Sequence, residues 1–569
     1  MAARLHYVEP RQRDLAAFGP HSARARGGVW GVRRSAPPSS MSERGFIPRE
    51  RKTRFRSEAL AFLSGLLVVL SFPRFGHGAV AWIALAPLLV ALAGAPGPAH
   101  GFRLGYITGA VSSLGLVYWT ATVVVQYGGL HLGLGIAVMV MLCLALALFP
   151  SLFGLLVAAW VRALGPRALL LSPLAWVASE ILRANTLCNF SWCLLGYSQQ
   201  PFPGFIQIAR YTAVYGVSLL LAGVSAALAS IALEKRAGPR WTVGLVTAAV
   251  TAGVWIHGEW LLGQRWPESG RITVGLVQAS ILQENKWDPS RALENVQGHV
   301  ELTRRAAARG ARLVVWPESA VPFSFDDAPA VAEELRALGR ELSIYLLFGN
   351  DDREDPPGGP YRAWVAAKML TPQGELTLRY RKIRLVPFGE YVPLQPVLTL
   401  GGRFTARLVR QVADFTPGQE YSVADVDGHR VSAFICYEAI FPDLIRQFTV
   451  HGAELLVNIT NDAWYGYSSA PYQHLGMAAF RAVENERYLV RAANTGISAV
   501  VDPRGRIVER TGLFRPETLV REVAFVPGTT FYARHGDVFA WGCLAAAVAI
   551  TAATWRQRQR SAISNQRSA

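Results

Sequence analysis

The sequence predicts a polytopic α-helical membrane domain of about eight transmembrane helices that carries an extracytoplasmic α/β domain. Of its 569 residues, 51% are hydrophobic and only 17% are charged, against about 25% charged in an ordinary soluble domain. The apolar residues gather in eight stretches, and one polar segment of about 260 residues separates the seventh stretch from the eighth. These observations exclude a single soluble globule.

The net charge of +17 is concentrated at the two ends of the chain. Residues 1–57 contain 13 Lys or Arg against 4 acidic residues, and residues 556–569 contain 4 Arg and no acidic residue. This distribution is typical of cytoplasmic membrane flanks. A protein that binds nucleic acid would carry its charge on a folded face interleaved with aromatic residues, so we expect no nucleic-acid partner.

The eight apolar stretches are the candidate transmembrane helices. Most of them approach or exceed the roughly 17 to 25 residues that a spanning helix needs. The first and fifth are short, and the fourth is long and contains Pro150. The stretches are 59–72, 79–95, 105–125, 132–161, 168–182, 213–233, 241–262 and 538–555.

The charges of the connecting loops predict the orientation. With the N-terminus in the cytoplasm, six basic residues fall in inside loops and three in outside loops, as the positive-inside rule requires. An even number of helices also returns the Arg-rich C-terminus to the cytoplasm. Because seven helices precede residue 263 and one follows residue 537, the polar segment between them is predicted to lie on the outer face of the membrane.

The polar segment shows alternating strand and helix patterns, which predict one α/β domain. Strand-like runs occur at Ile272–Val277, Leu313–Val315, Ile344–Phe348, Leu455–Asn458 and Ile497–Val501, and helical patterns at Ala292–Ala308 and His474–Leu489. The predicted organisation is a basic disordered cytoplasmic N-terminus (1–57), helices one to seven (58–263), the catalytic domain (264–533), helix eight (534–556) and a basic cytoplasmic tail (557–569).

Cys436 is the one cysteine of the polar segment; the other four lie in or next to apolar stretches. A domain that needed disulfides would contain an even number of cysteines, so Cys436 is either a buried, inert thiol or a reactive one. It ends the strand-like run VSAFICYE at 431–438, and α/β sheets present catalytic groups at strand ends. From this residue alone, a core thiol and a nucleophile are equally plausible.

Two further segments place ionisable residues beside apolar runs. In LVVWPESA (313–320), Pro317 ends a strand and puts Glu318 at its exit. In YRKIRLVPFGEYVP (380–393), Lys382 precedes a turn and Glu390 follows it. Taken singly, Glu318 could be a solvated loop carboxylate and Lys382 one of several surface cations.

Together these segments resemble the nitrilase, or carbon-nitrogen hydrolase, superfamily, whose acyl-transfer site uses Glu, Lys and Cys in this order. Within it, WPESA, LVPFGEYVP, ICYE, NITNDAWYG and RAANTGISAVVDPRG, with the eight-span frame, are similar to the apolipoprotein N-acyltransferase family. The resemblance extends over 59–555, including FPRFGHGAVAWIALAPLL and FSWCLLGYSQ in the apolar part. It implies that the α/β domain is a nitrilase-like αββα sandwich.

The resemblance implies a role for each member of the trio. Cys436 is expected to be the nucleophile that takes up a fatty acyl group as a thioester, and Glu318 the general base that removes its proton. Lys382 is expected to stabilise the tetrahedral oxyanion.

Supporting or substrate-binding roles follow for four more residues. Glu390 and Glu438 are expected to hold the lysine and shape the site, and Trp287 and Tyr437 to contact the acyl donor or position the nucleophile loop. For the two aromatic residues, core packing is equally plausible.

Other polar residues remain open. Asn461 and Asp462 are strand-end site residues or simply a turn. Glu180 and Arg183 are costly in lipid and therefore functional, or they pair with each other at the outer interface. Val365-Ala366 stands where family members usually have an Asn-Ser pair, which leaves one polar contact of the site unaccounted for.

The resemblance implies transfer of a fatty acyl chain from a phospholipid to the α-amino group of the N-terminal diacylglyceryl-cysteine of an apolipoprotein, the last step of lipoprotein maturation. It implies no metal and no diffusible cofactor. The expected location is the bacterial inner membrane, with the catalytic domain on the periplasmic side. The alternatives are a membrane-tethered amidase that uses water as the acceptor, and a transporter or scaffold that has lost catalysis. An intact trio disfavours the scaffold, and seven leading helices disfavour the amidase, since one anchor would suffice.

Overall fold

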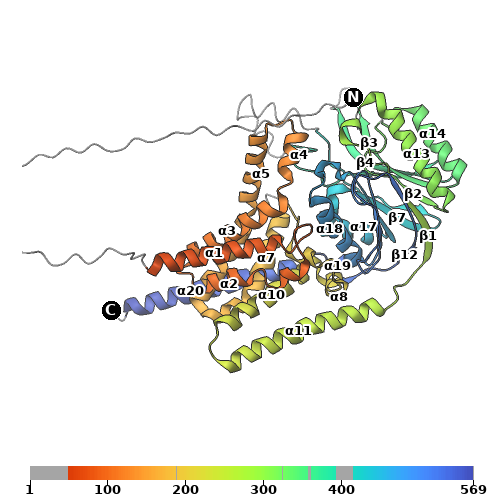
Figure 1. The fold of residues 1–569 in the computed structure, drawn as a ribbon. Helices are drawn as coiled ribbons and strands as arrows, with labels where there is room; N and C mark the ends of the chain where they lie inside the picture. Colours follow the sequence, from red (N-terminus) through yellow and green to blue (C-terminus); the bar gives the residue numbers. More distant parts are fainter. Residues whose placement is uncertain are drawn as a thin grey trace, which may run out of the picture. The chain divides into compact units, whose positions relative to one another are not determined.

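The apolar stretches of the sequence form the helical part of the protein. The computed structural model describes residues 49–186, 189–286, 288–322, 324–355, 361–392 and 414–567. Each of the eight apolar stretches lies mostly on helix (Figure 1). The helices of this part are α1 (Arg49–Val69), η1 (Gly78–Trp82), α2 (Ala86–Ala93), α3 (Pro98–Val117), α4 (Thr120–Gln126), α5 (Leu132–Leu146), α6 (Leu148–Leu164), η2 (Pro166–Leu171), α7 (Ser172–Asn185), η3 (Leu195–Gln199), α8 (Pro203–Ile206), α9 (Ala209–Thr212), α10 (Val214–Leu233), α11 (Ala237–Gly263) and α20 (Val538–Arg567).

Several of these helices are long and apolar enough to cross a membrane. Within the described ranges, four qualify by length and composition: Leu132–Leu164, Val214–Leu233, Ala237–Gly263 and Val538–Arg560. A fifth is added if α3 and α4, which meet at a bend of 52°, are one broken span. The predicted count of eight therefore stays a prediction.

The long fourth stretch is helical on both sides of Pro150. Helices α5 and α6 meet at Ala147, and Pro150 occupies the first turn of α6. The first N–H groups of a helix have no partner within it, so the missing N–H of proline costs little there.

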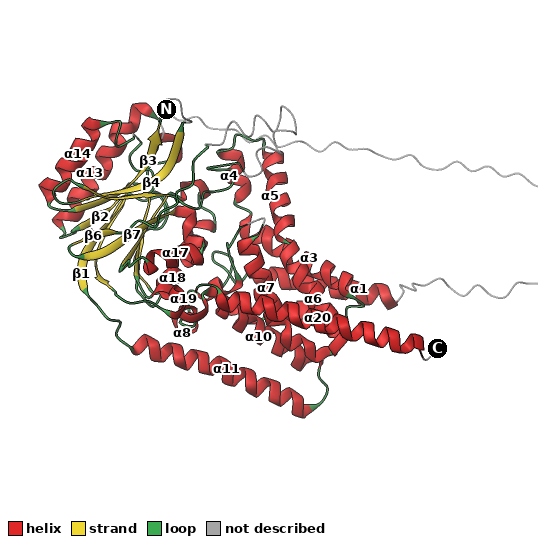
Figure 2. Cartoon of the chain, turned by 180° about the vertical axis from the view of Figure 1, so that it is seen from behind, coloured by secondary structure: helices red, strands yellow, loops and turns green. Residues whose placement is uncertain are grey.

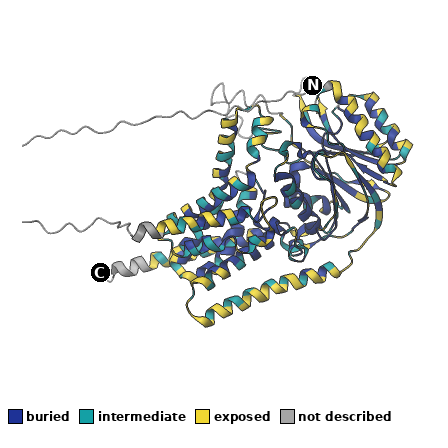
Figure 3. Ribbon diagram, viewed as in Figure 1, coloured by how far each residue is buried: buried dark blue, intermediate teal, exposed yellow. Residues whose placement is uncertain are grey.

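The surface of this part is apolar, as contact with lipid requires. Along α11, Trp241, Leu245, Ile256 and Trp260 are all exposed, and Figure 3 shows exposed residues along most of this helix. A soluble protein rarely exposes so continuous an apolar surface.

The polar segment folds into two six-stranded sheets. Their strand orders are β12-β1-β2-β3-β4-β5 and β11-β10-β9-β8-β7-β6. The strands are β1 (Gly270–Gln278), β2 (Leu313–Val315), β3 (Tyr345–Glu354), β4 (Arg362–Leu370), β5 (Leu376–Arg381), β6 (Ala424–Val426), β7 (His429–Ile435), β8 (Leu455–Thr460), β9 (Tyr488–Ala493), β10 (Ala499–Val501), β11 (Ile507–Arg510) and β12 (Glu517–Phe525).

Each sheet has three parallel strands at its centre and antiparallel strands on either side. β1, β2 and β3 are parallel in one sheet, and β7, β8 and β9 in the other. The carboxyl ends of parallel strands meet at one edge of a sheet, where loops can bring side chains together. Each set of three parallel strands therefore provides an edge at which a functional site can form.

Helices cover the outer faces of the two sheets, which gives four layers. Figures 1 and 2 show α13 and α14 along one sheet, and α17 and α18 along the other. The helices of this domain are α12 (Gln283–Lys286), η4 (Pro289–Arg291), α13 (Ala292–Ala308), α14 (Pro329–Leu342), η5 (Cys436–Ile440), α17 (Pro442–Val450), η6 (Asp462–Tyr465), α18 (Ala470–Asn485) and α19 (Phe531–His535).

Apolar side chains hold these layers together. One buried cluster contains Leu276 and Leu347 of the first sheet with Val457 and Ile459 of the second, so the sheets share a core. A second cluster lies between the first sheet and its covering helices. The domain is the expected αββα sandwich.

Some predicted elements have other boundaries in the structure. The runs at Leu313–Val315 and Ala292–Ala308 are β2 and α13 as predicted. The helix predicted at His474–Leu489 instead ends at Asn485, because Glu486 adopts a left-handed conformation with φ 53°. The strand predicted at Ile344–Phe348 continues to Glu354, since its polar end pairs with β4.

Candidate active site

Cys436 follows β7 directly and begins the short helix η5. Its φ of 49° lies in the left-handed region, which residues other than glycine rarely adopt. The residue is 5% exposed. The strand therefore ends in a sharp turn, and the thiol lies at the carboxyl edge of the second sheet.

Glu318 reaches the same place from the first sheet. It lies three residues after the end of β2 and is buried. Its Oε2 accepts a hydrogen bond of 2.9 Å from the backbone N–H of Asn461, which follows β8 in the second sheet. The carboxylate thus joins the strand ends of the two sheets.

Lys382 contributes a fully buried cation to this site. Its Nζ lies 2.6 Å from Glu390 Oε1 and 3.3 Å from Glu318 Oε1. Burial alone would lower the pKa of Lys382, but Glu390 and Glu318 together raise this pKa well above its ordinary value. The amine therefore carries its charge.

Glu390 is positioned by the turn that carries it. Its Oε2 accepts a hydrogen bond of 2.8 Å from the backbone N–H of Val386. The other oxygen is thereby directed to Lys382. As predicted for this residue, the carboxylate contacts the lysine; its role in catalysis stays a prediction.

The carboxylate of Glu438 binds backbone N–H groups beside Lys382, and its predicted part in shaping the site stays a prediction. Its Oε1 accepts hydrogen bonds from the Tyr380 hydroxyl (2.6 Å) and from the backbone N–H groups of Ile383 (2.7 Å) and Arg384 (3.1 Å). Its Oε2 accepts from the backbone N–H of Ile435 at 2.7 Å. It therefore ties the chain around Lys382 to the chain around Cys436, and the second carboxylate on the ammonium is that of Glu318.

The thiol of Cys436 is protonated in this environment. Burial is the largest cause that raises its pKa, the negative charge of Glu318 raises it further, and Lys382 opposes them. Cys436 thus needs a base at the moment of reaction. A buried carboxylate, a charged amine and a protonated thiol at one edge of the sandwich are the groups that acyl transfer through a thioester requires.

Of the two predicted aromatic residues, Tyr437 lies in the described part of the chain. Tyr437 is buried, packs edge-to-face on Phe441 with centroids 5.1 Å apart, and its hydroxyl lies 3.5 Å from the Asn189 carbonyl oxygen. It therefore reaches the loop after α7. Trp287 lies outside the described residues.

Asn461 and Asp462 both face the site. Besides its bond to Glu318, Asn461 donates from Nδ2 to Gln283 Oε1 at 2.7 Å. Asp462 is fully buried and pairs with Arg491 at 2.9 Å. Burial alone would raise the pKa of Asp462, but the positive charge of Arg491 is the largest of the causes that lower it to about 2. Both residues do more than form a turn.

The Val365-Ala366 pair lies buried on β4. The carbonyl oxygen of Val365 accepts a hydrogen bond of 2.8 Å from the backbone N–H of Lys382. This bond needs no polar side chain. The absence of an Asn-Ser pair at this position therefore does not affect the hydrogen bond that positions the Lys382 backbone.

Two ionisable residues near Glu318, the buried Lys286 and the half-buried Asp351, escaped sequence analysis. Lys286 donates from Nζ to the Glu318 carbonyl oxygen at 2.7 Å, and Asp351 accepts from the Ser319 hydroxyl at 3.1 Å. Burial lowers the pKa of Lys286 to about 8 and raises that of Asp351 to about 6. Lys286 lies next to Trp287 in the segment QENKW. Its position in that segment was the sequence signal that could have identified Lys286 as a site residue.

Glu180 and Arg183 hold a loop of the helical part against α7. Glu180 Oε1 accepts from Trp176 Nε1 at 3.0 Å and from the backbone N–H of Leu195 at 2.8 Å. Arg183 donates to the Trp192 carbonyl oxygen at 3.1 Å. Both line a cavity of about 40 Å³, as does Trp192.

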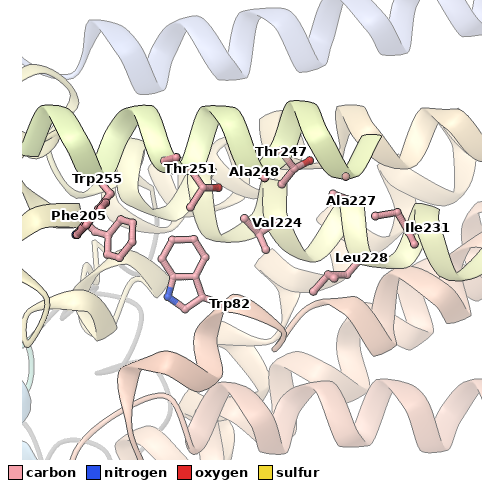
Figure 4. A pocket seen from close by; sticks show the side chains of 12 residues that line it. Trp82, Phe205, Val224, Ala227, Leu228, Ile231, Thr247, Ala248, Thr251 and Trp255 are labelled. Carbon is pink, nitrogen blue, oxygen red and sulfur yellow. The ribbon is translucent and has the colours of Figure 1, made fainter. Parts of the chain in front are cut away.

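A wider cavity of about 420 Å³ lies between α10 and α11. Figure 4 shows its apolar lining, with Trp82, Phe205 and Trp255 at one end. No member of the predicted trio lines it. The chemistry described above is therefore separate from this cavity.

Comparison with known proteins assigns the two parts of the chain to described domains. Residues 64–227 match the apolipoprotein N-acyltransferase N-terminal domain, and residues 273–526 match the carbon-nitrogen hydrolase domain. A solved amidase from Nesterenkonia sp. is 23% identical, covers 48% of this chain and 95% of its own, and has a TM-score of 0.34.

Full-length relatives are also found. The apolipoprotein N-acyltransferase of Geobacter metallireducens is 42% identical over 510 residues, which cover 88% of this chain and 96% of that protein. That of Methylococcus capsulatus is 34% identical over 513 residues, which cover 89% of this chain and 97% of that protein. The similarity extends over the helical part and the sandwich alike.

Proposed function

Because the chain belongs to the apolipoprotein N-acyltransferase family, we propose that it transfers a fatty acyl chain from a phospholipid to the N-terminal α-amino group of a diacylglyceryl-cysteine apolipoprotein. It does so in two steps through a thioester on Cys436. The observation that carries this proposal is the buried ammonium of Lys382 between the carboxylates of Glu318 and Glu390, at the strand ends where Cys436 lies.

The first step acylates the enzyme. Glu318 takes the thiol proton of Cys436 as Sγ attacks the ester carbonyl of the phospholipid, and the charged Lys382 stabilises the oxyanion that forms. The ester C–O bond then breaks. Glu318 returns the proton to the departing oxygen, and a lysophospholipid leaves.

The second step transfers the acyl group. The free α-amine of the acceptor attacks the thioester carbonyl, Glu318 accepts a proton from the attacking nitrogen, and the C–S bond breaks. The proton passes to the departing sulfur, so the thiol is restored and an amide has formed. An α-amine has a reference pKa near 8, so a fraction of it is neutral and nucleophilic at about pH 7 to 8.

Placement in the membrane suits both substrates, because each is anchored in lipid. We propose eight transmembrane helices in the bacterial inner membrane, with the sandwich on the periplasmic side. The mostly helical conformation of all eight apolar stretches and the basic termini support this topology. Enzyme, donor and acceptor then meet in one leaflet.

The acceptor distinguishes acyl transfer from amide or ester hydrolysis. The names of the relatives favour transfer. Purified enzyme in detergent with phospholipid alone is expected to release one equivalent of lysophospholipid and then stall, because an apolar site around the thioester excludes water. A peptide with an N-terminal diacylglyceryl-cysteine should restart turnover and receive the acyl chain on nitrogen. Steady release of free fatty acid, undiminished by the peptide, would identify a hydrolase instead.

A further inference from the structure

His474, on α18, lies under the turn that carries the thiol. Its imidazole is fully buried, and Nε2 lies 3.1 Å from the carbonyl oxygen of Cys436. On the other side of the ring, Nδ1 lies 3.1 Å from Asp462 Oδ1 and 3.0 Å from Arg491 Nη2. The ring is therefore held between a buried ion pair and the backbone of Cys436.

The surroundings of the ring select one protonation state. A carbonyl oxygen can only accept a hydrogen bond, so Nε2 carries a proton. An Arg N–H can only donate, so we infer that Nδ1 accepts from Arg491 rather than donating to Asp462 Oδ1, which lies 3.1 Å away. Burial and the positive charge of Arg491 lower the pKa of His474 below its ordinary value, against the smaller opposing effects of Asp462 and the Cys436 carbonyl. The imidazole is thus neutral and donates from Nε2 alone.

The bond from His474 acts on the strained part of the turn. A left-handed conformation at a non-glycine residue such as Cys436 persists only where its surroundings hold it. The peptide unit that joins Cys436 to Tyr437 is planar, so a fixed carbonyl fixes the orientation of the whole unit. Glu438 holds the other side of the turn through the backbone N–H of Ile435.

The residue before His474 ties the same helical turn to the helical part of the protein. Gln473 Oε1 accepts a hydrogen bond of 2.8 Å from Trp192 Nε1, and Gln473 Nε2 donates to the Leu116 carbonyl oxygen at 3.2 Å. The ring of Trp192 also packs on the imidazole, with centroids 5.4 Å apart. The position of His474 is therefore set from both parts of the chain.

We propose that His474 is a positioning residue for acyl transfer, whose Nε2–H bond to the Cys436 carbonyl oxygen holds the turn in the conformation that directs Sγ at the donor. The inference rests on the proposed role of Cys436 as the nucleophile. The ring of His474 takes no proton in the reaction; it acts through Cys436.

Two amide variants separate this bond from the packing of the ring. The amide nitrogen of Gln reaches the position of Nε2, whereas that of Asn reaches only the position of Nδ1. We expect His474→Gln to keep the rate of thioester formation within about tenfold of the unaltered enzyme. We expect His474→Asn to be slower than His474→Gln by a further factor of about ten or more, as for the loss of one buried hydrogen bond. His451→Gln and His451→Asn, at the exposed histidine that follows α17 as its C-cap, serve as matched controls.

The rate is followed by quenched-flow mass spectrometry with phospholipid in detergent, and the melting temperature of each variant is measured beside it. A merely structural role would slow both variants in proportion to their loss of melting temperature. Equal rates in the two variants, whether high or low, would overturn the proposal. Absence of thioester in the unaltered enzyme would instead refute the nucleophilic role of Cys436, so the two failures are distinguishable.

A second measurement needs no destabilised variant. In protein labelled with ¹⁵N-histidine, the signal lost in His474→Gln is that of His474. The proposal predicts a neutral ring with the proton on Nε2 at pH 7. A protonated ring, or a proton on Nδ1, would contradict it.

Discussion

The ammonium of Lys382 and the carboxylate of Glu390 form a buried ion pair, with Nζ and Oε1 2.6 Å apart. The same ammonium also lies 3.3 Å from Oε1 of Glu318. Glu390 can therefore keep Lys382 charged and in place while Glu318 takes and returns a proton.

Glu390→Gln tests this division of labour. The amide cannot supply the negative charge that stabilises Lys382, so we expect thioester formation to slow by about 10- to 100-fold, the loss of a hydrogen bond to a charged group. Glu375→Gln, at an exposed position just before β5, is the matched control and should change nothing. A Glu390→Gln rate within twofold of the control would show that the pair is dispensable.

The charges around Cys436 predict how its thiol titrates. The negative charge of Glu318 raises the thiol pKa and Lys382 lowers it. Glu318→Gln should therefore shift the pH profile of alkylation by iodoacetamide to lower pH, although it abolishes transfer. Lys382→Met should shift the profile to higher pH. Shifts in the reverse directions would mean that these charges do not act on the thiol.

The ion pair of Asp462 and Arg491 predicts a pH-dependent contribution to stability. The pKa of Asp462 is lowered from 3.8 to about 2 in the folded protein, so the carboxylate stabilises the fold above about pH 4. That stability is lost as the pH falls through about 2.

Asp462→Asn leaves Arg491 buried without its counter-charge, which costs about 3 to 5 kcal/mol for a buried pair. We expect a lower melting temperature at pH 7 and a difference from the unaltered protein that shrinks between about pH 4 and 2. A difference that is independent of pH over this range would contradict the assignment. Thermal unfolding in detergent over this pH range measures both the melting temperature at pH 7 and its dependence on pH.

The proposed topology can be tested by introducing one additional cysteine at a time. Glu301 is exposed on α13 and Arg560 is exposed on α20, whereas Cys143, Cys193, Cys436 and Cys543 are buried. In spheroplasts, a maleimide that cannot cross the membrane should label Glu301→Cys at once. It should label Arg560→Cys only after permeabilisation, with the unaltered chain as background. Labelling in the opposite order would refute the periplasmic placement of the sandwich.

The sequence predicted those features that depend on local pattern. A lone thiol at the end of the apolar run before Cys436, and Glu318 after a strand ended by Pro317, both lie at strand exits in the structure. Apolar runs located the eight helical stretches, and the predicted strand-like runs fall on six of the twelve strands of the described residues. The number of membrane-spanning helices could not be predicted from the sequence. Helices α2 and α7 are too short to be judged by length alone, and whether they span the membrane depends on how they pack against neighbouring helices.

Features that depend on long-range contacts were missed. His474 lies 38 residues from its partner Cys436, and Lys286 lies 32 residues from Glu318. No local sequence pattern around His474 or Lys286 indicates which residue it contacts. Glu438 was expected to help hold Lys382 and shape the site, but the sequence could not show that the turn of η5 directs its carboxylate to the backbone N–H groups of Ile383 and Ile435.

The most direct test of the account is intact-mass and peptide mass spectrometry of the purified enzyme after incubation with phospholipid alone. We predict one acyl group per chain, located on Cys436, labile to neutral hydroxylamine and accompanied by one equivalent of lysophospholipid. Cys436→Ala should carry no acyl group, and Cys436→Ser should be nearly inactive, since a hydroxyl is far harder to deprotonate than a thiol. An acyl group on another residue, or full turnover with the acceptor peptide in Cys436→Ala, would contradict the central claim that Cys436 is the nucleophile.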